Sequence, residues 1–594
     1  MIATERTANM KGSILLLAWL GLMPSLTLAE GPAPRITELQ RCGDLLAQVP
    51  QQWCLQVEGL DSQPPVLWLG GQPLPHHAFK RQGRTLTLQL DPGQYRSAPL
   101  WLEAQGLQSN AVWLSTGSSH VLAAGPGEVA KNMDGLTTYV DLVSLLIEER
   151  HDGLEQARRI ARKYDAQVVG AIAPLNVYQL RLPVDDLIQR DAMVLRMGSE
   201  ASVDAVIIEE SAPERGKESS GTGEASSSWQ DEWAANRYLD AVYYYQRRIP
   251  AKRQQIKVQP VRVGVIERNL DFDAVDFAAY RGDCRASPGR LCLFARDAHK
   301  ADSHGSTVAG ILAADWQAQG NSGFLQGLGP ASPGFEVIVE RNSDAGITAN
   351  IAASVNLVED GVRVLNWSWG VHRVGARNIE GDEVDSLLRS GLAMSGYEEL
   401  LEEFFLWLRA KHPDVIVINS AGNGASRSGT DEYRLPSSFV TEQLLVVGGH
   451  QRNRSAQVLR APDYVVKRGS SNIDMRVDIS AAACVRASPA IAGDVGTVQC
   501  GTSYATPLVT ATVAAMLSIN PGLTPEQLRM LLRRSAMPLG QQQDFEATDG
   551  EDLTAPILPS ERDGKMNDED LGRSARLDMQ KALELAVQSL VRVR

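Results

Sequence analysis

Three successive patterns of apolar and polar positions follow one another along the chain, and each predicts a different architecture. Residues 30–125 contain short stretches in which apolar and polar residues alternate, separated by turn signals such as 91–93 (DPG). Alternation with a period of two is typical of strands with one buried face. This region is therefore predicted to form a small β-sandwich, with its tryptophans in the core rather than on a ligand platform.

The second pattern, over residues 135–210, mixes segments of strand and helix periodicity. In order, these are a strand at 143–147, a helix at 154–163, strands at 167–172 and 177–182, a helix at 184–197 and a strand at 203–208. This βαββαβ order predicts a compact α+β domain with two helices packed on one antiparallel sheet. Residues 211–228, rich in Ser, Gly and Glu, are predicted to be a linker without regular structure.

The third pattern, over residues 229–594, consists of short buried-strand candidates separated by helical stretches. The strands are expected at 261–266, 362–365, 415–418 and 444–447, and the clearest helices at 347–360 and 397–410. This order predicts an α/β domain with a mostly parallel sheet covered by helices on both faces. Active sites on such sheets gather at the carboxyl ends of the strands.

The first 29 residues have the features of a secretory signal. Basic residues precede the apolar run 14–20, and residues 27–29 (TLA) form a small-x-small cleavage site. A retained membrane anchor is the alternative. No later segment has enough consecutive apolar residues to span a bilayer. We therefore expect an exported protein, periplasmic or secreted, without stable membrane insertion after the signal is removed.

The net charge and the cysteines limit the partners and metal sites that the chain is expected to have. The charge of −13 argues against nucleic acid as a partner, because phosphate binding requires a basic surface. No Cys-x-x-Cys pair or interleaved histidine suggests zinc, so three short-loop disulfides are the expectation, although sequence does not fix their connectivity. The six cysteines fall as near neighbours: Cys42 and Cys54, Cys284 and Cys292, Cys484 and Cys500.

Four polar side chains follow or begin the predicted elements of the third region. Glu267 and Asn423 each follow a predicted strand, His304 begins a helix of small residues, and Ser503 precedes the apolar helical run 508–517. Together they supply a carboxylate, an imidazole, an amide donor and a hydroxyl, which acyl transfer by serine requires. Taken one at a time, Ser503 could be an N-cap, His304 a helix-start residue and Asn423 a turn residue.

Residues from about 260 to 588 resemble the catalytic domain of the subtilisin-like serine proteases (subtilases). The segments that carry the resemblance are 302–310 (DSHGSTVAG), 321–323 with 327–330, 365–370 (LNWSWG), 421–423 (AGN), 501–507 (GTSYATP) and 572–583. The region 135–210 is similar to the inhibitor-like prodomain that these enzymes often carry. The resemblance implies a three-layer subtilisin-like fold, preceded by an α+β prodomain and the small N-terminal β-sandwich.

The resemblance also implies an activity, that of a serine endopeptidase made as a precursor and acting on proteins or peptides through an acyl-enzyme. Ser503 would be the nucleophile, His304 the general base and then acid, and Asn423 the oxyanion donor. The strand expected to pair with substrate comprises Trp367, Ser368, Trp369 and Gly370. Its two tryptophans suggest a crowded cleft with a preference set by apolar contacts.

The chain departs from the family pattern at Glu267, where the family has Asp. Glu keeps the charge but moves it outward by about 1.5 Å, and a displacement of ~1 Å can lower a rate by ~10². Glu serves this role in α/β-hydrolases, so the chemistry permits it. Asp271 is a weaker substitute. The alternative is a catalytically impaired pseudoprotease, a peptide-binding or scaffolding module that recognises its partners through the N-terminal sandwich.

Two further expectations concern metals and maturation. Calcium is common in the family, but no Asp-rich loop of the EF-hand kind is present, and the acidic run 561–570 is more consistent with a solvated loop. No metal or other cofactor is therefore indicated. The domain 135–210 should fold on and block the catalytic cleft, with cleavage in the linker 211–228. A permanent, uncut spacer is the alternative.

Overall fold

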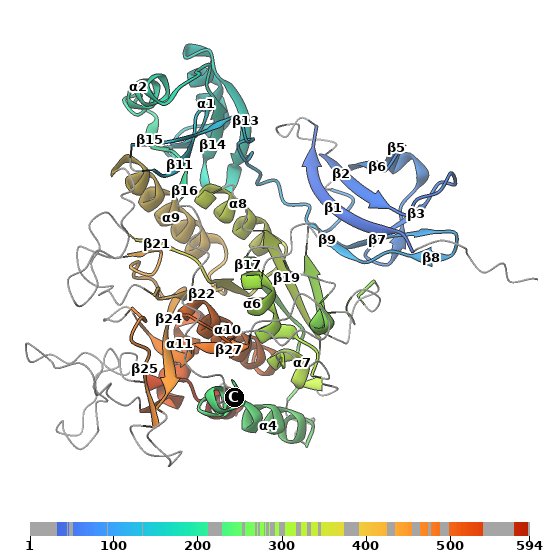
Figure 1. Ribbon diagram of the computed structural model, residues 1–594, viewed down its shortest axis with the longest axis vertical. Helices are drawn as coiled ribbons and strands as arrows, with labels where there is room; N and C mark the ends of the chain where they lie inside the picture. The colour runs from blue at the N-terminus through green and yellow to red at the C-terminus, as the bar shows by residue number, and fades with distance from the viewer. Residues whose placement is uncertain are drawn as a thin grey trace, which may run out of the picture.

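The structure is a computed structural model that describes most of residues 33–591. The segments outside the description are 44–45, 47–50, 92, 134, 212–228, 252–255, 268–269, 271–273, 278–279, 281–283, 286–290, 296–302, 317–321, 330–333, 342–345, 373–390, 424–433, 454–463, 473–476, 487–497 and 539–574. The predicted signal, nearly all of the predicted linker, Asp271 and the acidic run therefore lie outside the described residues. Figure 1 shows three units in chain order.

The first unit is a β-sandwich of two antiparallel sheets, which we call the N-terminal sandwich. One sheet has the order β1-β2-β6-β5 and the other the order β4-β3-β7-β8, with β9 also paired to β7. The strands are β1 (Arg35–Cys42), β2 (Gln51–Glu58), β3 (Val66–Leu69), β4 (Gln72–Pro73), β5 (Phe79–Gln82), β6 (Thr85–Leu90), β7 (Ala98–Ala104), β8 (Leu107–Gln108) and β9 (Val112–Leu114). Inward apolar residues alternate with outward ones along β2 and β6, as a half-buried strand requires.

The sandwich tryptophans do not all lie in its own core. Trp53 is buried there, but Trp101 and Trp113 belong to the cluster that continues into the third unit. The Trp113 ring lies 5.5 Å from that of Phe294, and its Nε1 donates to the Asp360 carboxylate at 2.9 Å. Trp101 and Trp113 are thus core side chains, as expected, but the core to which they belong extends from the sandwich into the third unit.

The second unit is a four-stranded antiparallel sheet with two helices, which we call the βαββαβ unit. Its elements are β12 (Leu142–Ile147), α1 (Gly153–Lys163), β13 (Gln167–Ile172), β14 (Val177–Arg181), α2 (Leu187–Met197) and β15 (Val203–Ile207). The sheet order is β13-β14-β12-β15. Each helix starts at an aspartate N-cap, Asp152 and Asp186, whose carboxylate accepts the N–H three residues on.

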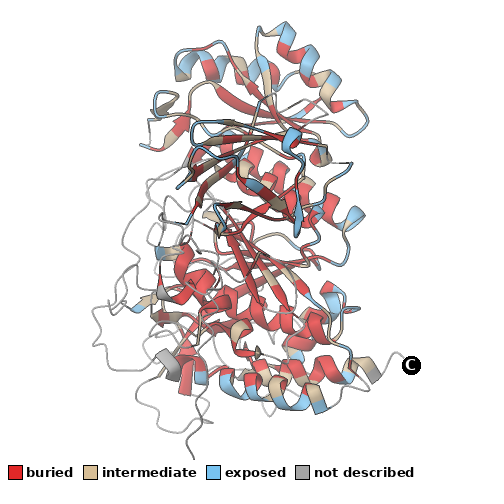
Figure 2. Cartoon of the chain, turned by 90° about the vertical axis from the view of Figure 1, so that its right-hand side faces the viewer, coloured by how far each residue is buried: buried red, intermediate tan, exposed pale blue. Residues whose placement is uncertain are grey.

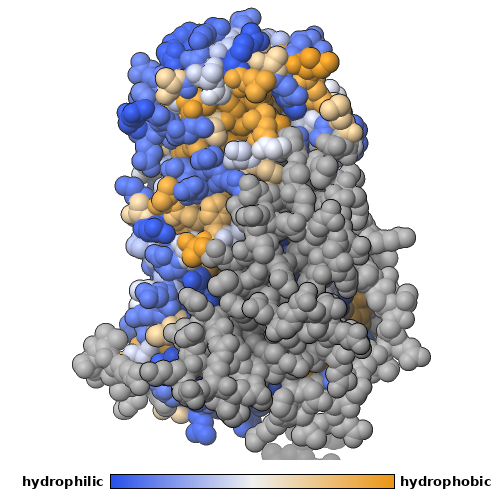
Figure 3. All heavy atoms as spheres, turned by 90° about the vertical axis from the view of Figure 1, so that its left-hand side faces the viewer, coloured by the Kyte–Doolittle hydropathy of each residue, from blue (hydrophilic) through white to orange (hydrophobic). Residues whose placement is uncertain are grey.

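The surface of the βαββαβ unit is partly apolar. Hydrophobic surface gathers at the upper end of the face in Figure 3, where this unit lies. Ile188 and Leu195 of α2 are among its exposed side chains. The chain enters and leaves this unit through a small sheet of order β10-β11-β16. Its strands are β10 (Val129–Lys131), β11 (Thr137–Tyr139) and β16 (Glu210–Ser211).

The third unit is built on a large, mostly parallel sheet. Its parallel strands are β18 (Cys292–Ala295), β19 (Phe335–Arg341), β17 (Val261–Glu267), β20 (Val364–Trp367), β22 (Ile416–Ser420), β24 (Leu444–Arg452), β26 (Ile479–Ala482) and β30 (Ala575–Arg576), in that spatial order. Antiparallel strands β29 (Met537–Pro538) and β25 (Val465–Lys467) pair with β30 and β24. The near-continuous apolar runs of β17, β20 and β22 fit a sheet buried on both faces.

Helices cover both faces of this sheet, and two neighbouring residues of β20 show which helix lies where. Asn366 bonds Thr510 of α10 (Thr502–Ile519), whereas Trp367 bonds Ser354 of α8 (Gly346–Glu359) and packs on Phe404 of α9 (Gly391–Lys411). Successive strand residues point to opposite faces, so α10 lies on one face and α8 with α9 on the other. Figure 2 shows the buried residues concentrated in the sheet and its central helices.

Helix α10 lies at the centre of the helical layer on its face of the large sheet. All of its residues are buried, and α6 (Ser303–Ala313) and α13 (Met579–Val591) pack against it. By length and composition α10 is the one helix, within the described part of the chain, that could cross a membrane, but the whole of it is enclosed by protein. Its hydrophobicity is accounted for by its place in the core.

The three cysteine pairs form disulfides as predicted: Cys42–Cys54, Cys284–Cys292 and Cys484–Cys500. The last joins directly opposed residues of β27 (Cys484–Arg486) and β28 (Val498–Cys500). The next residue, Gly501, donates its N–H to Ala483 at 2.8 Å. The disulfide Cys484–Cys500 therefore holds together the two paired strands that precede α10.

Both accessory units dock on α8, at its two ends. Glu209 of the segment after β15 accepts hydrogen bonds from the N–H groups of Ile347 and Thr348, at 3.0 and 2.9 Å, in the first turn. At the other end, Asn356 exchanges two hydrogen bonds with Ser119, and Asp360 accepts from Trp113 of the N-terminal sandwich. Burial raises the pKa of both carboxyl groups, Glu209 and Asp360, above their usual values.

Candidate active site

Glu267 and His304 form the first contact of the site. Glu267 is the last residue of β17, and His304 is the second residue of α6. The Glu267 Oε2 lies 2.8 Å from His304 Nδ1, and the Glu267 side chain is only 3% exposed. An ionised carboxylate can only accept, so Nδ1 carries the proton and Nε2 is left as an acceptor. The longer side chain at this position therefore still reaches the imidazole and sets the tautomer that a general base needs.

Ser503 lies in the first turn of α10. The helix begins at Thr502 and its N-cap is Gly501, so the alternative that Ser503 is an N-cap is wrong. A backbone N–H in the first turn has no acceptor within its helix, which leaves the Ser503 N–H available for an anion. The ring of the next residue, Tyr504, lies 5.2 Å from the ring of His304. The structure thus brings His304 and Ser503 into the first turns of two helices that pack on each other.

A proline explains how Ser503 is held. Pro507 has no N–H, so the Ser503 carbonyl, four residues earlier, has no donor within the helix. The Ser368 hydroxyl donates to that carbonyl at 2.9 Å, and the Ser503 hydroxyl donates back to the Ser368 carbonyl at 3.3 Å. Asn366 donates to the Ser368 hydroxyl and accepts from Thr510, which completes a buried chain of bonds from α10 to β20 and back.

Asn423 is exposed, just beyond the end of β22. Its Oδ1 accepts hydrogen bonds from the N–H and the hydroxyl of Thr502, at 2.8 and 3.2 Å. With the oxygen fixed in this way, Nδ2 is the part of the amide left to donate to a ligand. A Cβ on Gly501 would lie 3.2 Å from Nδ2, so the amide passes close to the loop that leads to Ser503.

Comparison with known proteins agrees with this geometry. The sequence model of the Subtilase family matches residues 294–568, a range that contains His304, Asn423 and Ser503. The third unit matches the Subtilase family over this range, and we call this unit the subtilase domain. The matched range begins after Glu267, the position at which the chain departs from the family pattern. The mostly parallel sheet and its helices agree with the expected subtilisin-like fold, and no curated protein matches the chain by sequence.

Solved structures of subtilisin-like proteases are similar to the chain at low identity. Fervidolysin from Fervidobacterium pennivorans, a keratinolytic enzyme related to subtilisin, is 16% identical with a TM-score of 0.46, over 79% of this chain and 64% of its own. The chain thus matches slightly less than two thirds of fervidolysin. The epidermin leader peptide processing serine protease of Staphylococcus aureus is 15% identical with a TM-score of 0.45, over 75% of this chain and 98% of its own.

The two tryptophans of the predicted substrate strand occupy different environments in the subtilase domain. Trp367 is fully buried against α8 and α9, so the expectation that its side chain crowds a cleft is wrong. Trp369 is half-buried and its ring lies tilted beside that of Trp367, with ring centroids 5.0 Å apart. Trp367 is the last residue of β20 and lies on the face that α8 and α9 cover, whereas Trp369 lies beyond the end of the strand, and this is the physical reason.

Sequence reasoning missed one buried charge beside the site. Arg434, the first residue of β23 (Arg434–Leu435), is only 6% exposed, and burial lowers its pKa to about 9. Its strand pairs with β21 (Val371–His372), which directly follows Gly370. No motif pointed to this arginine, since the segment that precedes it has no recognisable periodicity.

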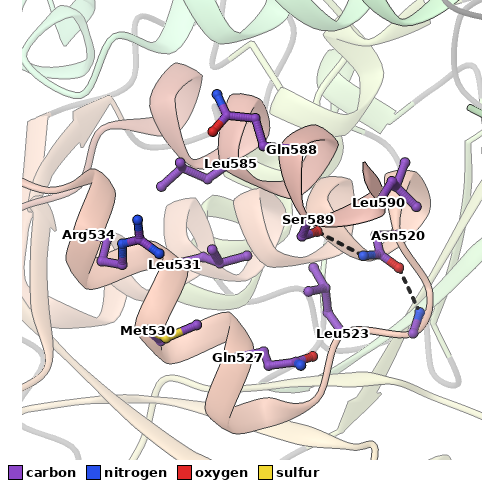
Figure 4. A pocket seen from close by; sticks show the side chains of 11 residues that line it. Asn520, Leu523, Gln527, Met530, Leu531, Arg534, Leu585, Gln588, Ser589 and Leu590 are labelled. Atoms are coloured by element: carbon purple, nitrogen blue, oxygen red, sulfur yellow. Dashed lines mark hydrogen bonds between the residues drawn. The ribbon is translucent and has the colours of Figure 1, made fainter. Parts of the chain in front are cut away.

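A groove of about 630 Å³ lies elsewhere in the domain, between α11 (Pro525–Ser535) and α13 (Figure 4). Asn520 lines the groove and donates a hydrogen bond to Ser589 at 2.8 Å. It lies just beyond the end of α10, 17 residues after Ser503. At 1.5 Å per residue this separates the groove from Ser503 by about 25 Å. Within the described ranges, no three His, Cys, Asp or Glu side chains come together in a way that could hold a metal ion.

Proposed function

We propose that the subtilase domain is a serine endopeptidase that hydrolyses peptide bonds through an acyl-enzyme. The observation that carries this proposal is the 2.8 Å contact between Glu267 and His304 Nδ1, because it places the ring proton on Nδ1 and makes Nε2 the nitrogen that can accept one. The position of Ser503 in the first turn of α10 supports it further, since the helix terminus stabilises negative charge.

The proposed reaction proceeds in two halves. The Ser503 hydroxyl turns from the Ser368 carbonyl to His304 Nε2, transfers its proton there and attacks the substrate carbonyl. The resulting oxyanion accepts hydrogen bonds from Asn423 Nδ2 and the Ser503 N–H, and one such donor is typically worth ~10²–10³ in rate. The imidazolium, stabilised by Glu267, protonates the leaving amine. Water then repeats the sequence on the acyl-enzyme and releases the acid.

We further propose that the protease is made as an exported precursor and that the βαββαβ unit restrains it before maturation. Helix α8 follows β19, so its first turn lies at the carboxyl edge of the sheet, where Glu267 and Asn423 also lie. Glu209 docks on this turn, and the chain enters the predicted linker shortly afterwards. The linker therefore starts from the same edge of the sheet as the proposed site. The three disulfides fit an oxidising compartment.

Casein cleavage by purified full-length protein tests the proposal. We expect wild type to cleave, Ser503→Ala to be inactive, and the matched control Ser199→Ala, at an exposed serine of the βαββαβ unit, to retain activity. N-terminal sequencing of the active species should show a start within or just after residues 211–228. Full activity in a chain that starts at Glu30 would contradict the maturation part, whereas an inert wild type would favour the pseudoprotease alternative.

A further inference from the structure

Arg434 is a buried charge that the proposed mechanism does not use. Its position is defined by two glycines that have no room for a side chain. A Cβ on Gly370 would lie 2.2 Å from the Arg434 Cζ, and a Cβ on Gly422 would lie 2.7 Å from its Cδ. The arginine side chain therefore lies directly against two backbone segments, one ending at Gly370 and one passing through Gly422.

Both segments also contact the start of α10, where Ser503 lies. Ser368, two residues before Gly370, exchanges hydrogen bonds with Ser503. The Gly422 N–H bonds the Thr502 hydroxyl at 3.1 Å, and Gly422 precedes the oxyanion donor Asn423. The guanidinium of Arg434 is thus held in the protein wall beside the point at which a substrate carbonyl would be attacked.

This guanidinium has only neutral partners. Its Nη1 donates to the carbonyl of Ser420 and, at 3.4 Å, to the hydroxyl of Ser437, and its Nη2 donates to the Ser420 hydroxyl at 3.2 Å. No carboxylate among the residues that the structure describes forms an ion pair with it, and Nε has no acceptor there. A buried cation without a counter-ion is costly, and this cost is relieved by an anion that binds beside it.

The available donors suit a carboxylate. Arginine presents five N–H groups in a fixed planar fork, and the three bonds above leave Nε–H and one N–H of Nη2 unused. A carboxylate matches two such donors at once, which gives both strength and directional selectivity. Uncharged or apolar side chains would leave the buried charge uncompensated.

We propose that Arg434 is a specificity-determining residue that binds the carboxylate of the substrate residue whose carbonyl is attacked, so that cleavage follows Glu or Asp. The oxyanion donor Asn423 receives that carbonyl, and Gly422 and Gly370 flank it, which places the side chain of the same substrate residue nearest to Arg434. This inference rests on the proposed protease function and names its substrate class.

A matched pair of peptides tests the inference. Two internally quenched peptides that differ only in Glu or Gln before the scissile bond are compared with a third that carries Leu. We expect wild-type kcat/KM to be at least about 50-fold higher for Glu than for Gln or Leu, as is typical when a buried charge is paired by only one of two ligands. Arg434→Gln should lower the Glu value to that of Gln.

Two controls keep the outcomes distinct. Arg409→Gln removes an exposed positive charge of α9 and should leave the Glu preference intact, and Arg434→Lys should retain part of it. Equal cleavage of the Glu and Gln peptides by wild type, or a preference for Leu, overturns the inference while the protease function stands. Should wild type cleave nothing, calorimetry with Ser503→Ala decides: tighter binding of a peptide ending in Glu than of one ending in Gln supports the role of Arg434, and equal binding refutes it.

Discussion

Glu267 and Glu209 are both buried carboxylates that bond the first turn of an α-helix, α6 in one case and α8 in the other. Glu267 bonds a side chain, the imidazole of His304, whereas Glu209 bonds the backbone N–H groups of Ile347 and Thr348. The hydroxyls of Thr348 and Tyr397 complete the second set. One contact joins two elements within the subtilase domain, and the other joins two units of the chain.

The difference lies in what the carboxylate controls. Backbone N–H groups do not titrate, so Glu209 can only attach the βαββαβ unit to α8 and orient it. Loss of Glu209 should therefore weaken the docking of that unit. An imidazole does titrate, so Glu267 determines which nitrogen carries the proton and how stable the imidazolium is. Two buried carboxylates at helix N-termini are therefore predicted to have unequal consequences for activity, and the variants of each glutamate test one side of this comparison.

The largest effect is expected for Glu267→Gln. The amide has nearly the same shape but no charge, and its NH2 group can turn toward Nδ1 and stabilise the wrong tautomer. We expect kcat to fall by about 10⁴ with little change in the thermal midpoint, because loss of the charged third group has this cost in serine proteases. Steady-state kinetics on casein or a peptide, with circular dichroism as the folding check, measures both quantities.

The next effect concerns the length of the side chain. Glu267→Asp withdraws the carboxylate by one methylene from a nitrogen that it now reaches at 2.8 Å. We expect kcat/KM to fall by about 10² unless the strand shifts to restore the contact. A gain of activity over an inert wild type would instead show that Glu267 impairs the site, and the pseudoprotease alternative would then be correct.

A structural effect without a catalytic one is expected at the other glutamate. Glu209→Ala leaves two buried N–H groups at the start of α8 without acceptors, which should cost about 1–3 kcal/mol of the stability of the full-length protein. Denaturant unfolding of Ser503→Ala protein, with and without the second change, measures this loss free of self-cleavage. Glu155→Ala, at an exposed glutamate of α1, is the control that should leave the unfolding free energy unchanged.

The smallest effect concerns acidic side chains that face one another between the same two units. Burial, together with the nearby carboxylates of Glu149, Asp204 and Glu402, raises the pKa of Glu403 on α9 to about 6. The folded protein therefore holds a proton there that the unfolded chain releases, so this site disfavours folding as pH rises from about 4.5 through 6. Glu403→Gln should raise the thermal midpoint by about 1–2 °C at pH 7.5 and leave it unchanged at pH 4.5. An equal shift at both pH values would contradict this assignment.

Much of the architecture could be predicted because hydrophobic period and element order agree. The strands of the βαββαβ unit and four strands of the parallel sheet were expected close to their observed positions. Strands β18, β19 and β26 were missed, since they are short or carry polar residues within apolar runs. Helix α9 was expected to be shorter than its observed extent, because its first turns lack a clear apolar period.

The residues of the candidate site also fall into two groups, those within recognisable local motifs and those that depend on contacts with distant parts of the chain. Ser503, His304 and Asn423 stand in local motifs that the sequence displays directly. Arg434 and Glu209 act through contacts with residues far along the chain, so no local pattern reveals them. Trp367 was misassigned because the motif gives its position on β20 but not the face to which its side chain points.

Labelling by an alkylphosphonate probe, followed by peptide mapping, is the direct test of Ser503 as the nucleophile, because only an activated serine beside an oxyanion site reacts. We expect a phosphonylated peptide that contains Ser503 in wild type, and loss of that product in Ser503→Ala and in His304→Ala. Label on another residue, or label that persists when Ser503 is replaced, would contradict it.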